Sequence, residues 1–477
     1  MLKFIDSILH SFRSCFSREA TFQWFVVIIV GLLLRSDHLG VTSFIRDLVL
    51  NPACYETLNH FFRSSAWSLE SLRQAWLHVI KTSAPVCREK DAVILIGDGV
   101  KQPKEARYMP GIKKLHQESE NSSKASYIFG HLFGAVGVLI GTPDKWFCLP
   151  LFFQLQDGVK AIFSWTSPVE RQDSHVVQMI DQGFTAAKTF GKALFLLDRY
   201  FLSVPALTRL NQYNQTGEAT MHIVTKAKLS CCAFTRPSTA KAGRGRPRKK
   251  GAAVKLKTLF STRASEFKSA RVSLYGKEEL VQYLCLDLLW GQKLYQPLRF
   301  VLVKYKDSLS ILVSTDLKLE PTAIIRLYGC RFKIECTFRE MKQAIGGLAY
   351  HFWSKSMPKL QRYIKRDDVH PLEKVTDPKQ QQNILLTIKA IEGYVMCSCI
   401  AMGLLQLIAI RYSDQVPALF WRYLRTPSKL IVSEATVMFY LRKHIFRLFA
   451  QNPHLSITQI IMSKQKITAF MDDRQAS

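Results

Sequence analysis

One helix is predicted by residues 320–347, which read EPTAIIRLYGCRFKIECTFREMKQAIGG. Pro321 suits the first turn of a helix, where a missing N–H costs nothing, and Gly346 and Gly347 suit its end. At about 100° per residue, side chains at offsets of 0, 3, 7 and 14 share an arc of roughly 60°. Four polar side chains stand at those offsets: Tyr328, Arg331, Glu335 and Lys342. One helix face thus carries a carboxylate, two cations and an aromatic ring, a set that can bind a metal ion and a phosphate together.

The alternative interpretation of that face is a solvated surface on which Arg331 and Glu335 form an ordinary pair at i, i+4. Two acids in other parts of the chain argue against a merely solvated surface. Residues 91–100 (DAVILIGDGV) predict a buried strand that ends at Asp98, and residues 192–200 (KALFLLDRY) predict a second one that ends at Asp198. Acids at strand ends are often only turn formers, so each is informative mainly in combination with the others.

The expected elements follow a recognisable order. Strands are predicted at residues 91–100, 127–140 and 146–154, a helix at 172–191, and a further strand at 192–200. Three strands, a helix and another strand is the order of an RNase H-like fold, in which the first and fourth strands are neighbours. In such a fold, Asp98 and Asp198 are expected at adjacent strand ends with the helix that carries Glu335 beside them.

Three carboxylates at one point repel one another unless cations neutralise them. Oxygen ligands without His or Cys suit Mg²⁺ or Mn²⁺. The expected site is therefore a pair of divalent ions held by Asp98, Asp198 and Glu335, the arrangement used for in-line phosphoryl transfer.

The pattern Y-x2-R-x3-E-x6-K at residues 328–342 resembles the signature of one large branch of bacterial insertion-sequence transposases of the DDE type. The resemblance implies that Glu335 is the third metal-binding carboxylate and that Tyr328, Arg331 and Lys342 contact DNA. It also implies metal-dependent strand cleavage and strand transfer by two Mg²⁺ or Mn²⁺ ions per active site. The implied partners are double-stranded DNA, as terminal inverted repeats and target, and a second copy of the chain in a homodimer on DNA. The implied location is the bacterial cytoplasm, at the nucleoid.

We expect an α/β protein with an RNase H-like catalytic core, a β-rich insertion and helical regions at both ends. The expected strands of the insertion lie near residues 221–226, 280–289 and 298–305, and the core is expected to resume with a last strand at 310–314. Five segments follow: a helical DNA-end-binding domain at 1–88, the first part of the core at 89–205, the basic insertion at 206–308, the second part of the core at 309–412, and a helical tail at 413–477.

The composition favours a polyanionic partner. Lys and Arg number 66 against 37 Asp and Glu, which gives a formal net charge of +29. One rival interpretation is a DNA-binding protein without chemistry, derived from a transposase. A second is a basic protein at a membrane, because residues 24–34 and 393–410 are strongly apolar. The first run is too short to span a bilayer, and we expect the second to be a buried core helix behind the sheet, with no membrane association.

The insertion contains the most basic part of the chain, because residues 236–271 hold twelve Lys or Arg and one acid, Glu266. Its centre, at residues 243–250, is similar to an AT-hook, whose extended Arg-Gly-Arg-Pro core lies in the minor groove of A·T-rich DNA. The alternative is a basic loop that meets phosphates without reading sequence. Three arginines are the DNA-binding candidates in either case: Arg244, Arg246 and Arg248.

Replacing Arg244 and Arg246 together with Ala separates these two interpretations. For a phosphate tether, we expect affinity to fall alike on all duplexes and the slope of log affinity against log salt to drop by about two. Titrations of A·T-rich and G·C-rich duplexes at several salt concentrations measure both quantities. A loss confined to A·T-rich DNA, reproduced by the charge-neutral change Gly245→Val, would instead show minor-groove reading.

Overall fold

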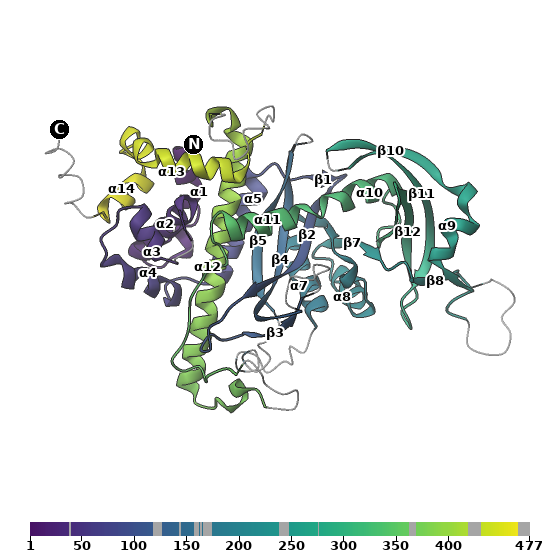
Figure 1. Cartoon of the computed structure of the whole chain (residues 1–477), viewed down its shortest axis with the longest axis horizontal. Helices are drawn as coiled ribbons and strands as arrows, with labels where there is room; N and C mark the ends of the chain where they lie inside the picture. Colours follow the sequence, from purple (N-terminus) through teal and green to yellow (C-terminus); the bar gives the residue numbers. More distant parts are fainter. Residues whose placement is uncertain are drawn as a thin grey trace.

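The protein is described by a computed structural model that covers residues 1–37, 40–117, 126–142, 145–156, 162, 165, 174–237, 248–274, 276–361, 369–417 and 431–465 (Figure 1). It is a mixed α/β protein in which one long sheet joins two halves. The helices of the two chain ends gather on one side of Figure 1, and the inserted strands lie on the other.

The first half of the sheet follows the predicted order of elements. Its strands are β1 (Arg88–Glu89), β2 (Ala92–Pro103), β3 (Lys113–His116), β4 (Tyr127–Thr142), β5 (Lys145–Leu155), β6 (Lys192–Leu196) and β7 (Thr220–Ala227). β5 pairs with β4 and β4 with β2, both antiparallel, whereas β2, β6 and β7 are parallel neighbours. The first part of β2 and strands β4, β5 and β6 are almost wholly apolar, as is usual where both faces of a sheet are covered.

The second half of the sheet continues from β7 without a break. Its strands are β8 (Cys232–Phe234), β9 (Ala253–Lys255), β10 (Lys268–Leu274), β11 (Lys277–Trp290), β12 (Gln296–Tyr305) and β13 (Ser308–Ser314). β13 pairs with β7, and the order then runs through β12 and β11 to β8 and β9, with β10 on β11. A short helix, α9 (Leu259–Thr262), packs with these strands in a second apolar cluster around Phe300 and Leu302.

One predicted strand has a different place from the expected one. Residues 221–226 were assigned to the insertion, but they form β7, which pairs in parallel with β6 from Lys192↔Thr220 to Leu196↔Val224. The strand expected at 310–314, β13, lies beyond β7 in the sheet. The strand that extends the core is therefore β7, because its connection through α8 (Val204–Gln215) returns it parallel to β6.

The predicted helix at 320–347 is two helices. α10 (Pro321–Cys330) begins at Pro321 as expected, and α11 (Lys333–Gln343) follows after a turn at Arg331 and Phe332. Both turn residues keep right-handed helical backbone angles, but the amides of Arg331, Ile334 and Glu335 bond to carbonyls three residues back. These tighter bonds interrupt the α-helical ladder, and the two helices follow one another across the sheet (Figure 1).

Helices cover both faces of the core strands. α7 (His175–Phe190), where a helix was predicted, packs on β4, β2 and β6 with α8 beside it, and α11 packs on β5 and β2. The N-terminal region is helical as expected, with α1 (Leu2–His10), α2 (Glu19–Leu34), α3 (Thr42–Asp47), α4 (Cys54–Arg63) and α5 (Leu69–Ser83). α13 (Glu434–Gln451) and α14 (Ser456–Ser463) pack against α2.

The apolar run at 393–410 lies in α12 (Pro378–Arg411), which is the central helix of the fold. α12 packs on β5 on one side and on α2, α4, α5 and α13 on others. Among the described residues it is the one helix long and apolar enough to cross a membrane, yet 94% of its apolar window is buried inside the protein. The prediction of a buried core helix behind the sheet is confirmed.

Gly403 of α12 marks the tightest of these contacts. A Cβ atom there would lie 2.3 Å from the ring of Trp76, which is fully buried and donates from Nε1 to the Pro150 carbonyl at 3.0 Å. Gly403→Ala should therefore destabilise the protein by about 1–3 kcal/mol through overpacking, although alanine is intrinsically the better helix former by about 1 kcal/mol. Thermal unfolding measures the change.

Gly329→Ala in α10 is the matched control, because its added Cβ would meet only the flexible end of Leu274 at 3.1 Å. A gain of stability for Gly403→Ala comparable to that of the control would contradict the packing described for α12.

Candidate functional site

Asp98 lies inside β2, just past the point where its parallel neighbour ends. The β2–β6 pairing stops at Ile96↔Leu196, whereas β2 continues beside β4 to Pro103. The Asp98 carboxylate thus lies half-buried at the edge that β6 leaves open, and its Oδ1 accepts from the Gly99 amide at 2.8 Å. The flanking glycines serve packing here, because the space beside Gly97 is filled by the ring of Phe195 and Gly99 lies against His175.

Asp198 follows the end of β6. It stands two residues after Leu196 and directly before a short 3-10 helix (Arg199–Phe201). Its carbonyl accepts from the hydroxyl of Thr225 at 2.8 Å, and the preceding residue, Leu197, donates to the carbonyl of Val224 at 2.9 Å. Strand β7 therefore fixes the backbone that presents Asp198.

Glu335 lies in the first turn of α11, where the helix dipole favours a carboxylate. Arg331 joins it to the sheet, because the guanidinium donates to Glu335 Oε1 at 2.6 Å from Nη2 and to Asp98 Oδ2 at 3.1 Å from Nη1. The turn between α10 and α11 places Arg331 between these two acids. The Arg331 side chain is only 15% exposed, and its pair with Asp98 is better shielded from water than its pair with Glu335, which is 40% exposed.

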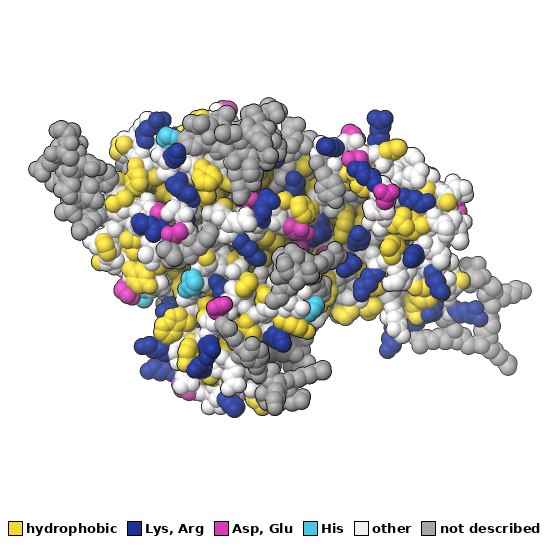
Figure 2. Space-filling model, in the orientation of Figure 1, with side chains coloured by type: hydrophobic (Ala, Val, Ile, Leu, Met, Phe, Trp, Pro, Cys, Tyr) yellow, Lys and Arg dark blue, Asp and Glu magenta, His cyan; other side chains and the backbone are white. Residues whose placement is uncertain are grey.

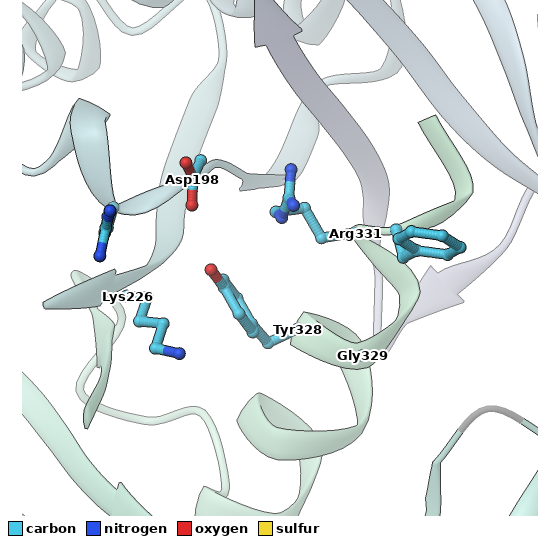
Figure 3. A pocket seen from close by; sticks show the side chains of 7 residues that line it. Asp198, Lys226, Tyr328, Gly329 and Arg331 are labelled. Atoms are coloured by element: carbon cyan, nitrogen blue, oxygen red, sulfur yellow. The ribbon is translucent and has the colours of Figure 1, made fainter. Parts of the chain in front are cut away.

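Two cavities meet at Asp198. The first, of about 380 Å³, is lined by Asp198, Arg199, Lys226, Tyr328, Gly329, Arg331 and Phe332. Figure 3 shows the Tyr328 hydroxyl directed toward the Asp198 carboxylate, with the Arg331 guanidinium beside them and Lys226 across the cavity. The second, of about 350 Å³, contains both Asp98 and Asp198 and is rimmed by Lys101, Lys113, Lys114 and His116. Asp198 therefore lies between two hollows lined by Lys and Arg side chains, whereas Asp98 lines only the second and Glu335 lines neither.

The ionisation of the site reflects this grouping. Burial raises the pKa of Asp98 to about 6, with smaller contributions from Asp198 and Glu335, against the opposing effect of Arg331. Burial disfavours the charge of Arg331, but Asp98, Tyr328 and Glu335 outweigh it and raise its pKa further, so the guanidinium stays charged. Burial also raises the pKa of Tyr328, which therefore remains a neutral hydroxyl that can donate to an anion.

The donor set fits a hard divalent cation, because Asp98, Asp198 and Glu335 offer only oxygens and already hold one cationic group between two of them. Within the part of the chain that the structure describes, no three His, Cys, Asp or Glu side chains are gathered closely enough to hold a metal ion. Arg331 lies between Asp98 and Glu335, so metal binding by all three acids requires that Arg331 move aside.

The remaining predicted DNA contacts lie elsewhere. Lys342, near the end of α11, donates from Nζ to the Lys101 carbonyl at 3.1 Å and lines neither cavity described above. Arg248 is exposed next to β9, at the far end of the sheet from Asp98. Arg244 and Arg246 lie outside the described residues.

Several residues of the site were not predicted. Lys226 lines the first cavity because β7, which carries it, runs parallel to β6. Residues 221–226 were assigned to the insertion from the sequence, so Lys226 was not placed near Asp198. Arg199, the neighbour of Asp198 in the sequence, lines the same cavity. Phe332 is 50% exposed there because the chain turns at that residue, whereas a continuous helix was expected. The basic loop after Asp98 was the available signal for Lys113 and Lys114.

Comparison with known proteins identifies a family for this chain. A family model described as DDE superfamily endonuclease matches residues 11–275, which include Asp98 and Asp198 and end before Glu335. No curated protein and no solved structure matches the chain. Members of this superfamily carry out nuclease-type phosphoryl transfer on DNA and generally use divalent metal ions. Because the match spans more than half of its length, the chain belongs to the DDE superfamily of endonucleases.

Proposed function

We propose that the protein is an insertion-sequence transposase, which cleaves DNA at the ends of a mobile element and transfers the freed strands. The observation that carries the proposal is that Arg331 bonds to both Asp98 and Glu335, while Asp98 and Asp198 line one cavity. The family supports DNA cleavage, and the Y-R-E-K pattern supports the narrower assignment to insertion sequences.

We further propose that the core is RNase H-like. The order β5–β4–β2–β6–β7, with β2, β6 and β7 parallel and the other two antiparallel, supports this assignment. In this arrangement the first and fourth strands, β2 and β6, are adjacent, which is the reason that Asp98 and Asp198 lie at one edge.

In the proposed mechanism, Asp98, Asp198 and Glu335 would hold two divalent cations. Such ions, when bound, activate an attacking oxygen and stabilise the leaving oxygen of an in-line displacement. Arg331 neutralises Asp98 and Glu335 before DNA binds, and it is then placed to bind the phosphate beside the scissile bond. The Tyr328 hydroxyl, which points into the first cavity, can donate to a phosphate oxygen, and Lys226 and Arg199 add positive charge there.

The surface is suited to a long duplex. Figure 2 shows Lys and Arg side chains spread over the inserted strands and along the face that carries α10 and α11, with few acids among them. A net charge of +29 favours attraction of the DNA backbone over the whole of this face. The insertion would thus extend the contact with DNA beyond the catalytic site.

Removing any one carboxylate should abolish cleavage. We expect Asp98→Asn, Asp198→Asn and Glu335→Gln each to lower the rate of Mg²⁺- or Mn²⁺-dependent nicking of terminal-repeat DNA by well over tenfold, while DNA binding changes little. Each substitution removes a metal ligand without adding bulk, and tenfold corresponds to only about 1.4 kcal/mol. Nicking assays on DNA from the ends of the element measure the rate.

Asp91→Asn is the matched control, because Asp91 precedes β2, is 73% exposed and pairs with Lys192 at 2.8 Å. A variant among the three that cleaves within tenfold of the wild type would show that its carboxylate is not a metal ligand. Wild-type protein that binds these ends but never cleaves them with either metal would favour the non-catalytic DNA-binding protein instead.

Lys226 provides a test of the first cavity. Lys226→Gln should weaken DNA binding modestly and lower the slope of log affinity against log salt by about one, because one phosphate contact is lost. Cleavage should fall more than binding, since the lost contact lies beside Asp198. Lys255→Gln, an exposed lysine on β9, is the control for charge alone, and equal cleavage by the two variants would exclude Lys226 from the site.

A further inference from the structure

The chain directly after α11 is held by two buried cations. Residues 345–350, here called the post-helix segment, follow the helix that carries Glu335. Arg35, which is fully buried at the end of α2, donates from Nη1 to the carbonyls of Ile345 at 3.3 Å and Gly346 at 3.0 Å. Lys104, which is 8% exposed, donates from Nζ to the carbonyls of Leu348 at 2.9 Å and Tyr350 at 2.7 Å.

Arg35 is an unusual core residue. No acid forms an ion pair with it among the described residues, and its Nε and Nη2 atoms have no hydrogen-bond partner there. Its other contacts are the Tyr394 hydroxyl, which also donates to the Gly346 carbonyl at 3.2 Å, and the ring of Phe44. Burial of a cation without a neighbouring acid costs free energy of folding. The presence of Arg35 in the core therefore indicates a specific role.

Lys104 holds the other end of the post-helix segment through Tyr350. Its ammonium lies 3.8 Å from the centre of the Tyr350 ring, an arrangement that favours the cation, whereas burial lowers the pKa of Lys104 to about 7. His131 fixes the hydroxyl of that ring. Its Nε2 donates to the Pro110 carbonyl at 2.8 Å, and burial lowers the pKa of His131 to about 3, so the neutral ring accepts from the Tyr350 hydroxyl at 2.6 Å through Nδ1.

The two cations belong to different parts of the fold. Lys104 follows β2, the strand that carries Asp98, whereas Arg35 belongs to the N-terminal helical region. The carbonyls that they bind follow the last helical residue, Gln343, so the two side chains anchor the chain where it leaves α11. α11 has eleven residues and is therefore a rod of about 16 Å, so a shift of its last turn would be transmitted to Glu335 in its first turn.

We propose that Arg35 and Lys104 are positioning residues that set the place of Glu335 against Asp98 by holding the post-helix segment. The link through Arg35 also makes the catalytic helix depend on the placement of the N-terminal helices. The inference deepens the proposed function and rests on it for the role of Glu335, but the contacts of the post-helix segment do not depend on that role.

The experiment compares Arg35→Met and Lys104→Met with Arg442→Met. Arg442 donates from Nε to the Leu34 carbonyl at 2.9 Å and from Nη2 to the Arg35 carbonyl, so its loss disturbs the same helix junction without touching the post-helix segment. Amide hydrogen exchange is followed for α11 and, as a reference, for β4. Metal-dependent nicking and DNA affinity are measured on the same proteins.

We expect Arg35→Met and Lys104→Met to speed exchange in α11 by at least tenfold with little change in β4, and to lower the rate of nicking at saturating DNA by at least tenfold with affinity unchanged. Arg442→Met should do neither. Arg35→Lys should restore part of the nicking rate, since an ammonium can still donate to a carbonyl. If Arg35→Met does not fold, Arg35→Lys replaces it in the comparison.

Unchanged exchange in α11, or exchange that rises equally in β4, would overturn the positioning role whatever the activity. Faster exchange in α11 with an unchanged rate of nicking would overturn it as well. Wild-type protein that never nicks DNA would refute the proposed function alone, and the exchange data would still decide whether Arg35 and Lys104 hold α11.

Discussion

The ion pairs of Arg331 with Asp98 and Glu335 are the interaction on which the rest of the structure depends. Acids from a sheet edge and from a helix approach one another closely only if a cation neutralises them. In the protein alone, Arg331 performs that task with bonds of 3.1 and 2.6 Å. The turn between α10 and α11 directs Arg331 toward both acids and leaves Phe332 at the surface of the cavity.

The surrounding architecture brings these elements together. β2 and β6 are parallel neighbours, so their carboxyl ends meet at one edge, and β7 completes that edge with Thr225 and Lys226. α12 supports the arrangement from behind, since it packs on β5 and on the helices of both chain ends. The N-terminal helices are therefore built into the core of the protein and contact the segment after α11 through Arg35.

The sequence was sufficient for the features that local patterns determine. Continuous apolar runs located β2, β4, β5 and β6, and the apolar run at 393–410 was correctly predicted to be a buried helix. Features set by long-range pairing were not predictable in this way. Residues 221–226 form an ordinary strand whose partner, β6, cannot be read from periodicity, so Lys226 was missed. The break at Arg331 and Phe332 contains no proline and only Gly329 nearby, and a 3.6-residue period runs through it unchanged. Arg35 carries no signal at all, because its partners are carbonyls more than 300 residues away.

The central claim is that Asp98, Asp198 and Glu335 together bind divalent metal ions once Arg331 releases its acids. A crystal structure of the protein with DNA from the ends of its element and Mn²⁺ tests this most directly, because anomalous scattering locates the metal without ambiguity. The account predicts Mn²⁺ coordinated by all three carboxylates, with the Arg331 guanidinium displaced from Asp98 onto a phosphate. Metal bound elsewhere, or Arg331 still bonded to both Asp98 and Glu335 in the presence of DNA and Mn²⁺, would contradict it.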